Sequence, residues 1–302
     1  MKKMSKTIVF FGSGPVAAES LRLLVEDFEI EAVVTKPRPP HHRGEYPVGE
    51  VAEELNLKVF TPSNTDELND LFNRKPVNSQ LGLVIDYGIL ISKQVIDYFP
   101  FGIVNSHFSI LPEWRGADPI SFAILSGQKT TGVSLMLVDE GLDEGPILAQ
   151  KEFQLPSSIT TPELTVELIK LSHELLVEVM PKYKGGQIKP VSQESTGRPV
   201  SHSRKLTKED GIIDWNKSAE QIEREVRAYS GWPRSRAKLG NVELVITKSH
   251  AIEGVSKPGE LHIQNKKLGV YTSNGILIID SLIPAGRKEM SAEAFLAGYK
   301  IN

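Results

Sequence analysis

Three side chains near the middle of the chain have the types and spacing needed for proton transfer and acyl-group chemistry. Asn105 and His107 lie two residues apart at the end of an apolar segment, so on a strand both point to the same face. Asp143 follows a second apolar segment, in a loop bounded by Gly141 and Gly145. Imidazole can accept a proton near neutral pH, and an amide can donate to a developing oxyanion. A carboxylate can orient the imidazole and stabilise its charged form.

This set predicts direct transfer of an acyl group to an amine, because the chain contains no cysteine that could serve as a nucleophile. The absence of cysteine also excludes disulfides and thiolate metal sites, and it agrees with a reducing cytosol. Spacing alone leaves a solvated acidic turn around Asp143 as an equally good interpretation. His41 and His42 are adjacent to each other and remote from His107, so we expect no metal site.

A glycine-rich turn follows the first apolar segment and resembles a weak dinucleotide fingerprint. It contains Gly12 and Gly14. A nicotinamide site prefers an acidic residue at the end of the second strand, and residues 34–37 supply none. Arg38 could suit a 2′-phosphate, so an NAD(P) oxidoreductase stays a minor alternative. The simpler interpretation is that the two glycines permit a tight turn.

The elements around these residues alternate between strand and helix. Strands are predicted over residues 7–12, 29–35, 57–60, 81–88 and 102–107, with helical patterns at 15–26, 46–55, 64–73, 92–98 and 161–182. This rhythm predicts an α/β fold with an open, mostly parallel, Rossmann-like sheet. Ligands bind beyond the carboxyl ends of strands in such sheets, which is where Asn105 and His107 fall. No stretch is apolar enough to span a membrane.

The amino-acid composition and charge of the chain change near residue 183. Residues 182–205 carry six lysines and arginines against one acid, whereas residues 1–181 carry 15 against 25. The segment is rich in Gly, Pro and Ser, so we interpret it as a linker whose charge can bind a polyanion or only be solvated. A short helix at 218–230 and several short strands follow, which predicts a small OB-like β-barrel. The predicted domains are 1–188, a basic linker 189–205, and 206–302.

The motifs from Asn105 to Pro112, Trp114 to Ala117 and Gly141 to Gly145 resemble those of the 10-formyltetrahydrofolate-dependent formyltransferases. In the second part, residues 204–215, 227–233 and 286–298 resemble the branch of that family that acts on methionyl-tRNA. The resemblance covers nearly the whole chain. It implies a Rossmann-like catalytic domain and an OB-like tRNA-binding domain. It also implies that 10-formyltetrahydrofolate is the co-substrate and initiator methionyl-tRNA the acceptor, without a metal.

The resemblance also implies residue roles. Asn105, His107 and Asp143 match the catalytic residues of the family. The folate-binding positions correspond to Tyr87, Gly88, Ser109, Ile110, Leu111, Pro112, Val138 and Asp139. The candidates for tRNA contacts are Arg38, Arg43, Lys184, Lys189, Arg204, Lys205 and Lys208. We expect a cytoplasmic monomer that does not bind membranes.

Two departures from the family pattern affect these expectations. Phe108 is bulky where a small residue is common, and the loop over residues 36–49 is shorter and less basic than the usual RNA-contacting insertion. An alternative function is formyl transfer to a nucleotide-sugar or another small amine. A further alternative, from another class, is a non-catalytic RNA-binding protein with a vestigial Rossmann domain.

Overall fold

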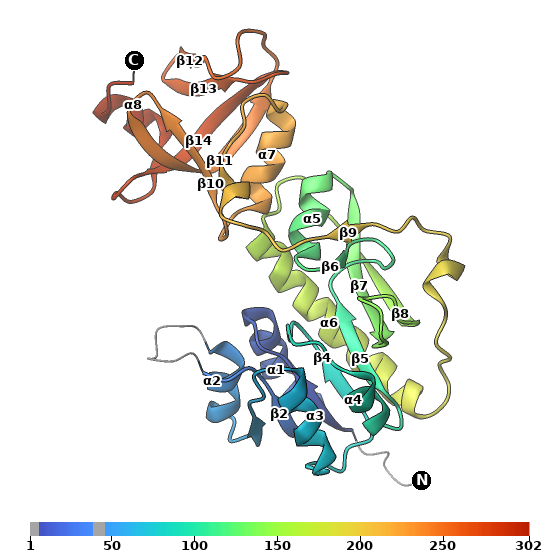
Figure 1. Cartoon of the computed structure of the whole chain (residues 1–302). Coiled ribbons are helices and arrows are strands. Elements are labelled where there is room, and N and C mark those ends of the chain that lie inside the picture. The colour runs from blue at the N-terminus through green and yellow to red at the C-terminus, as the bar shows by residue number, and fades with distance from the viewer. Residues whose placement is uncertain (1–5, 39–45, 302) are drawn as a thin grey trace. The chain divides into compact units, whose positions relative to one another are not determined.

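The apolar segments predicted as strands between residues 7 and 107 belong to one sheet in the computed structural model, which describes residues 6–38 and 46–301 (Figure 1). The chain divides into two compact units. The first comprises Met1–Gly116, Thr131–Gln154 and Thr165–His202, and the second comprises Ala117–Thr130, Leu155–Leu164 and Ser203–Asn302.

The sheet of the first unit has seven strands, and their order confirms the Rossmann-like fold. Pairing is parallel from β3 to β5 and becomes antiparallel between β5 and β7. The strands lie in the order β3 (Val59–Phe60), β2 (Glu29–Val34), β1 (Thr7–Phe11), β4 (Gly82–Val84), β5 (Ile103–His107), β7 (Thr130–Leu137) and β8 (Ile147–Gln154). The helices are α1 (Pro15–Asp27), α2 (Pro47–Glu54), α3 (Thr65–Asn73), α4 (Lys93–Tyr98) and α6 (Thr161–Lys184).

Aromatic packing holds one face of this sheet against the helices. Phe11 on β1 lies with its ring centroid 5.8 Å from that of Phe72 on α3 and 6.0 Å from that of Phe99. All three are at most 2 % exposed. Burial of one such side chain stabilises the fold by about 1.5–3 kcal/mol. This rigid sheet fixes the carboxyl end of β5, where the candidate site lies.

The second unit contains an antiparallel sheet, as expected for an OB-like domain. Its path is β10 (Ser235–Leu239), β11 (Val242–Ile252), β14 (Ile276–Pro284), β13 (Lys267–Tyr271) and β12 (Leu261–Gln264), with β15 (Met290–Ser291) paired to β14. The helices are α5 (Pro119–Ser126), α7 (Ala219–Ala228) and α8 (Ala292–Gly298). Ser218 caps the start of α7, since its Oγ accepts from the Gln221 N–H at 3.2 Å. The hydrophobic core of the second unit includes Ile222, Leu277 and Phe295.

A buried ion pair lies beside this core. Lys217 Nζ donates to Glu225 Oε1 at 2.6 Å, and the Glu225 side chain is 5 % exposed. Burial raises the pKa of the Glu225 carboxyl, and Lys217 opposes that rise. Because the folded-state pKa of Glu225 is raised, its ionisation lowers stability as pH rises through that value.

Replacement of Lys217 by methionine is therefore expected to destabilise the fold in a pH-dependent way. It leaves a buried carboxylate without its partner at pH 7, at a cost of roughly 1–3 kcal/mol. At pH 4.5, which lies below the raised pKa of the Glu225 carboxyl, protonation removes most of that cost. Thermal unfolding followed by circular dichroism at both pH values measures this difference. Lys238→Met, at an exposed position of β10, is the control, and an equal Tm loss at both pH values for Lys217→Met would contradict the account.

Candidate active site

Strand β5 places Asn105 and His107 on one face because side chains alternate along a strand. Ser106, between them, points the other way, and its Oγ lies 2.7 Å from Ser172 Oγ on α6. The His107 side chain is only 7 % exposed. The sheet therefore fixes the positions of Asn105 and His107. The Ser106–Ser172 contact on the opposite face helps to hold β5 in its orientation.

Asp143 lies in the loop between β7 and β8 and reaches both of these side chains. Its Oδ1 accepts from Asn105 Nδ2 at 3.1 Å, and its Oδ2 accepts from the Gly116 backbone N–H at 2.8 Å. Oδ2 also lies 3.7 Å from His107 Nδ1, which is longer than a hydrogen bond. Asp143 has φ 53°, a left-handed conformation that Asp tolerates better than most residues. The structure thus brings together the three side chains that the sequence singled out.

The other ring nitrogen of His107 determines how the ring can act. Nε2 lies 2.9 Å from the Trp114 backbone oxygen, which can only accept, so Nε2 carries the proton. Nδ1 then presents a lone pair, beside the Asp143 carboxylate. The ring can take up a proton at Nδ1, and the carboxylate can stabilise the resulting charge.

The segment that follows β5 is buried. Ser109, Ile110 and Leu111 are at most 3 % exposed. The backbone of this segment is held from β7 and β8, because Ser134 Oγ donates to the Ser109 oxygen at 2.6 Å and Gln150 Nε2 donates to the Leu111 oxygen at 2.8 Å. The segment, which ends with the buried Pro112, is therefore held firmly directly after His107.

The remaining folate-binding candidates lie at the ends of β4 and β7. Tyr87 is 3 % exposed, its hydroxyl has no hydrogen-bond partner among the described residues, and burial raises its pKa. Gly88 has φ +67°, a conformation that favours glycine. Val138 and Asp139 line an open groove of about 440 Å³. The other residues that line it are Lys93, Ile96, Asp97, Glu140 and Gly141.

The structure gives the glycine turn a role other than nucleotide binding. The Ser13 and Gly14 N–H groups donate to the Asp86 backbone oxygen at 2.9 and 3.2 Å. A Cβ on Gly14 would lie 1.8 Å from Asp86 Oδ2. The turn therefore packs against a carboxylate and has already used the donors that a pyrophosphate would need. This arrangement argues against the NAD(P) alternative.

The basic candidates are placed in different surroundings. Arg38 pairs with Glu50 and Glu53 and lies over the Tyr46 ring at 4.7 Å, whereas Arg43 lies outside the described residues. Arg204 pairs with Asp210 at 2.5 Å, although its side chain is 61 % exposed. Three further candidates are exposed, and no salt bridge is formed by them within the described part of the chain: Lys189, Lys205 and Lys208.

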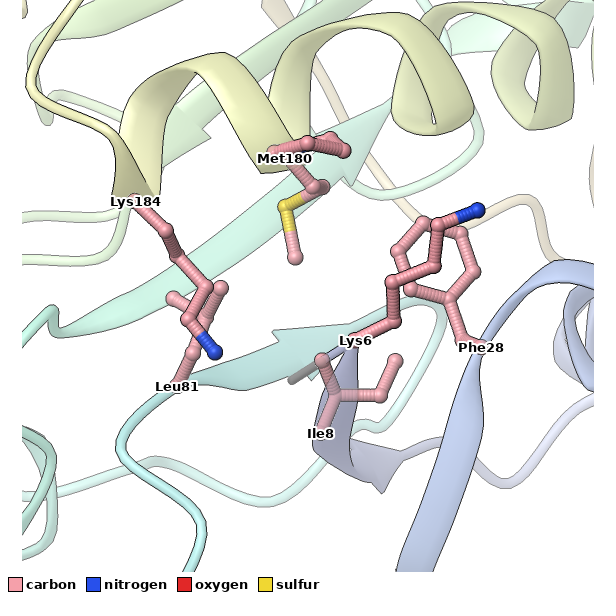
Figure 2. A pocket seen from close by; sticks show the side chains of 7 residues that line it. Lys6, Ile8, Phe28, Leu81, Met180 and Lys184 are labelled. Carbon is pink, nitrogen blue, oxygen red and sulfur yellow. The ribbon is translucent and has the colours of Figure 1, made fainter. Parts of the chain in front are cut away.

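Lys184 lies apart from the catalytic set, at the amino ends of the parallel strands. Figure 2 shows it beside a small pocket, with Ile8 and Leu81 near the beginnings of β1 and β4. His107 is at the carboxyl end of β5, which runs parallel to β4. Lys184 and His107 are therefore at opposite edges of the sheet. Burial lowers the pKa of the Lys184 ammonium group.

Two residues that the sequence analysis did not assign to the site contact the Asp143 loop. Gln193, in the predicted linker, is 3 % exposed, and its Nε2 donates to the Asp143 backbone oxygen at 2.8 Å. Arg115 donates to Gln193 Oε1 and to Glu144. A single Gln in a Gly-, Pro- and Ser-rich segment carries no sequence signal of this role. The contact depends on how the segment docks.

The described part of the chain offers neither a cluster of metal ligands nor a membrane-spanning helix. Across residues 6–38 and 46–301, no group of three or more His, Cys, Asp and Glu side chains is arranged to hold a metal ion. Within the same residues, no helix has both the length and the apolar character to cross a bilayer.

Comparison with known proteins gives matches along almost the entire chain. Sequence models of the Formyl transferase domain and of the Formyl transferase C-terminal domain match residues 6–180 and 205–300. The methionyl-tRNA formyltransferase of Thermodesulfovibrio yellowstonii is 36 % identical over 99 % of this chain and 98 % of its own length. That of Chloroflexus aurantiacus is 37 % identical over 96 % of each.

Solved structures at lower identity share the fold. The N-formyltransferase from Helicobacter canadensis, in complex with folinic acid and dTDP-3-aminofucose, has a TM-score of 0.68 at 17 % identity, covering 95 % of this chain and 100 % of its own. HypX from Aquifex aeolicus, in complex with tetrahydrofolic acid, has a TM-score of 0.62 at 18 % identity, covering 98 % of this chain and 48 % of its own.

Proposed function

Because the chain belongs to the methionyl-tRNA formyltransferase family, we propose that Asn105, His107 and Asp143 carry out its reaction. The enzyme transfers the formyl group of 10-formyltetrahydrofolate to the amino group of initiator methionyl-tRNA, giving N-formylmethionyl-tRNA for translation initiation. The position of Asp143 carries this residue assignment, because its carboxylate accepts a hydrogen bond from Asn105 and lies beside His107.

Each side chain has a distinct task in this proposal. The methionyl amine forms the new C–N bond to the formyl carbon, and the bond to the donor nitrogen breaks. His107 takes the amine proton at Nδ1, and Asp143 stabilises the charge on the ring. The ring then gives this proton to the donor nitrogen, so tetrahydrofolate leaves with a neutral amine and His107 returns to its starting state. Asn105 uses one amide N–H for Asp143, and within the described residues its second N–H has no partner, so it can donate to the formyl oxygen as negative charge develops there.

The groove lined by Val138, Asp139 and Gly141, which belong to the same loop as Asp143, suits the folate co-substrate, which supplies an activated formyl group. Its volume lies within the range typical of small-molecule sites. Ile96 and Val138 give it apolar contacts for a flat ring, whereas the Lys93 ammonium group in its lining is paired with Asp97 at 2.7 Å. We assign Tyr87, Gly88, Val138 and Asp139 to this site, and the buried segment from Ser109 to Pro112 to its floor.

We further propose that residues 1–188 form the catalytic domain, 189–205 the linker and 206–302 the tRNA-binding domain. The two family matches support this division, since the first ends at residue 180 and the second begins at residue 205. An enzyme of initiator tRNA works where translation occurs, so we place it in the cytoplasm. We expect a monomer, and light scattering during gel filtration measures whether its mass equals that of one 33.4 kDa chain.

The acceptor distinguishes this function from formyl transfer to a sugar amine. In a competition reaction with 10-formyltetrahydrofolate, we expect the label to appear on initiator methionyl-tRNA and not on a dTDP-amino sugar. The relatives with more than 30 % identity support the tRNA acceptor, whereas the sugar enzyme from Helicobacter canadensis is similar only in fold. Preferential formylation of the sugar would reverse the assignment.

Neutralising the exposed basic candidates is expected to weaken the salt dependence of tRNA binding. Each lysine that contacts a phosphate releases counterions, so it contributes about one unit to the slope of log K against log salt. Lys189, Lys205 and Lys208, changed together to glutamine, should lower the magnitude of that slope by about two to three units. Filter binding of tRNA at several salt concentrations measures it.

A matched triple variant controls for net charge. Lys58, Lys75 and Lys170 are exposed residues outside both the basic segment and residues 206–302, and their change to glutamine removes the same charge. We expect this control to alter the slope by less than one unit. An equal decrease in both triple variants, or no decrease in the first, would place the tRNA on another surface.

A further inference from the structure

The segment from Val191 to Ser201 packs against the rest of the first unit, which carries the candidate active site, although its composition predicts a solvated linker. Val191 and Ile147 exchange two backbone hydrogen bonds, at 2.7 and 2.8 Å. Further along, Arg198 pairs with Glu152 at 2.7 Å and with Glu113 at 3.3 Å. The segment is therefore held at several points on the same unit that carries Asn105, His107 and Asp143.

Gln193 is the buried centre of this docked segment. Its Nε2 donates to two carbonyl oxygens of the Asp143 loop, those of Asp143 itself at 2.8 Å and of Gly145 at 2.9 Å. Its Oε1 accepts from Arg115 Nε at 3.1 Å and from a terminal nitrogen of the same guanidinium group at 2.9 Å. One carboxamide thus uses both donor hydrogens and its acceptor to join the Asp143 loop to Arg115.

The same segment also holds the partner of His107. Ser201 Oγ accepts from the Trp114 N–H at 2.9 Å, and its backbone oxygen accepts from the Arg115 N–H at 3.0 Å. These bonds lie in the region where β6 (Arg115–Gly116) pairs with β9 (His202–Ser203). Trp114 provides the oxygen that faces His107 Nε2. The segment therefore contacts the supports of both Asp143 and His107.

The loop that Gln193 holds needs an external support. Asp143 has positive φ, an uncommon conformation for a residue with a side chain, and such conformations persist where the surroundings fix them. The Asp143 carboxylate must keep contact with Asn105 and remain beside His107. A displacement of about 1 Å in such a constellation can cost about 10²-fold in rate.

We infer that Gln193 is a positioning residue that acts through Asp143, and that the segment from Val191 to Ser201 is part of the active-site scaffold. The inference rests on the proposed roles of His107 and Asp143. It assigns a catalytic consequence to a segment whose sequence indicates only a connection between domains. Gln193 itself reaches no reacting atom, since its two ends are occupied by the loop and by Arg115.

Gln193→Glu isolates the donor function of the side chain. It keeps the shape and the acceptor oxygen for Arg115, so the segment should stay docked. It replaces the donor nitrogen by an oxygen that faces two carbonyl oxygens and repels them. We expect kcat to fall about 10–100-fold, with KM for both substrates changed by less than about threefold. Gln128→Glu is the matched control, since Gln128 Nε2 also donates to a backbone oxygen, that of Thr130.

A double-mutant cycle separates positioning from general damage to the fold. The four proteins are wild type, Gln193→Glu, Asp143→Asn and the double variant, compared by single-turnover rate. If Gln193 acts through Asp143, Gln193→Glu should lower the single-turnover rate by less than about threefold in the Asp143→Asn background. Gln193→Met, which lacks both hydrogen-bonding ends, repeats the cycle if the glutamate variant does not fold.

The outcomes of the cycle are distinct. Unchanged kcat in Gln193→Glu, or a fully multiplicative loss in the double variant, would overturn the role of Gln193 while leaving the site intact. Wild-type activity in Asp143→Asn would instead overturn the assignment of the site on which the inference rests.

Discussion

Replacement of His107 by alanine is expected to lower kcat by about 10²–10⁴-fold, because it removes the group that takes the proton from the attacking amine. The side chain is 7 % exposed and its loss leaves the backbone of β5 paired on both sides. The affinity for tRNA should stay within about twofold of wild type, since the ring does not contact the basic segment. Steady-state formylation and filter binding measure the two quantities on the same preparation.

The control for this variant is Ser106→Ala, on the opposite face of the same strand. It removes only the contact with Ser172 and should leave kcat within a few-fold of wild type. If the two variants lost activity equally, the effect would arise from damage to β5 and not from loss of the base. A non-catalytic RNA-binding protein would show no formylation in any of these preparations.

Replacement of Asp143 by asparagine is expected to have an effect of similar size, about 10²–10⁴-fold in kcat. Asparagine tolerates positive φ as aspartate does, so the loop can keep its path. It removes the negative charge beside His107 Nδ1. It also places a donor NH2 group where one of the two carboxylate oxygens was, so either the Gly116 N–H or the Asn105 amide loses its acceptor at that position.

Asp143→Asn can lower kcat in a second way besides the loss of charge, by moving the Asn105 amide. If the Asn105 amide turns to meet the new side chain, the donor for the formyl oxygen is misplaced as well, and kcat falls without a large change in KM for either substrate. Measurement of kcat and KM with each substrate varied in turn tests this pattern. A large rise in KM for the folate with kcat unchanged would show that Asp143 serves in binding only.

The sequence was sufficient to predict much of the site because strand periodicity and sheet topology act locally. Asn105 and His107 are two residues apart on one strand, so their common face follows from the backbone alone. Their location at a carboxyl end follows from the alternation of strands and helices. The convergence of Asp143, 36 residues beyond His107, could be stated only as an expectation, because it depends on how β7 and β8 add to the sheet.

Other features could not be predicted, because they depend on tertiary contacts between distant segments. Composition predicts a linker over residues 189–205, but it does not indicate that Gln193 is buried against the Asp143 loop. The segment at α5 is mostly apolar, with Ser121 and Ser126 as its polar residues, and its position against α7 arises only in the folded unit. Lys184 belongs to a basic segment in the sequence, but in the folded chain it lies where the parallel strands begin, at the end of the sheet opposite to His107.

The most direct test of the account is a single-turnover reaction with enzyme in excess over initiator methionyl-tRNA and saturating 10-formyltetrahydrofolate. Quenched samples are analysed for N-formylmethionine released from the tRNA. We expect complete conversion by wild type, and conversion by His107→Ala to the same amplitude with a rate constant about 10²–10⁴-fold lower. Equal rate constants for wild type and His107→Ala would contradict the central claim that His107 carries the proton in formyl transfer.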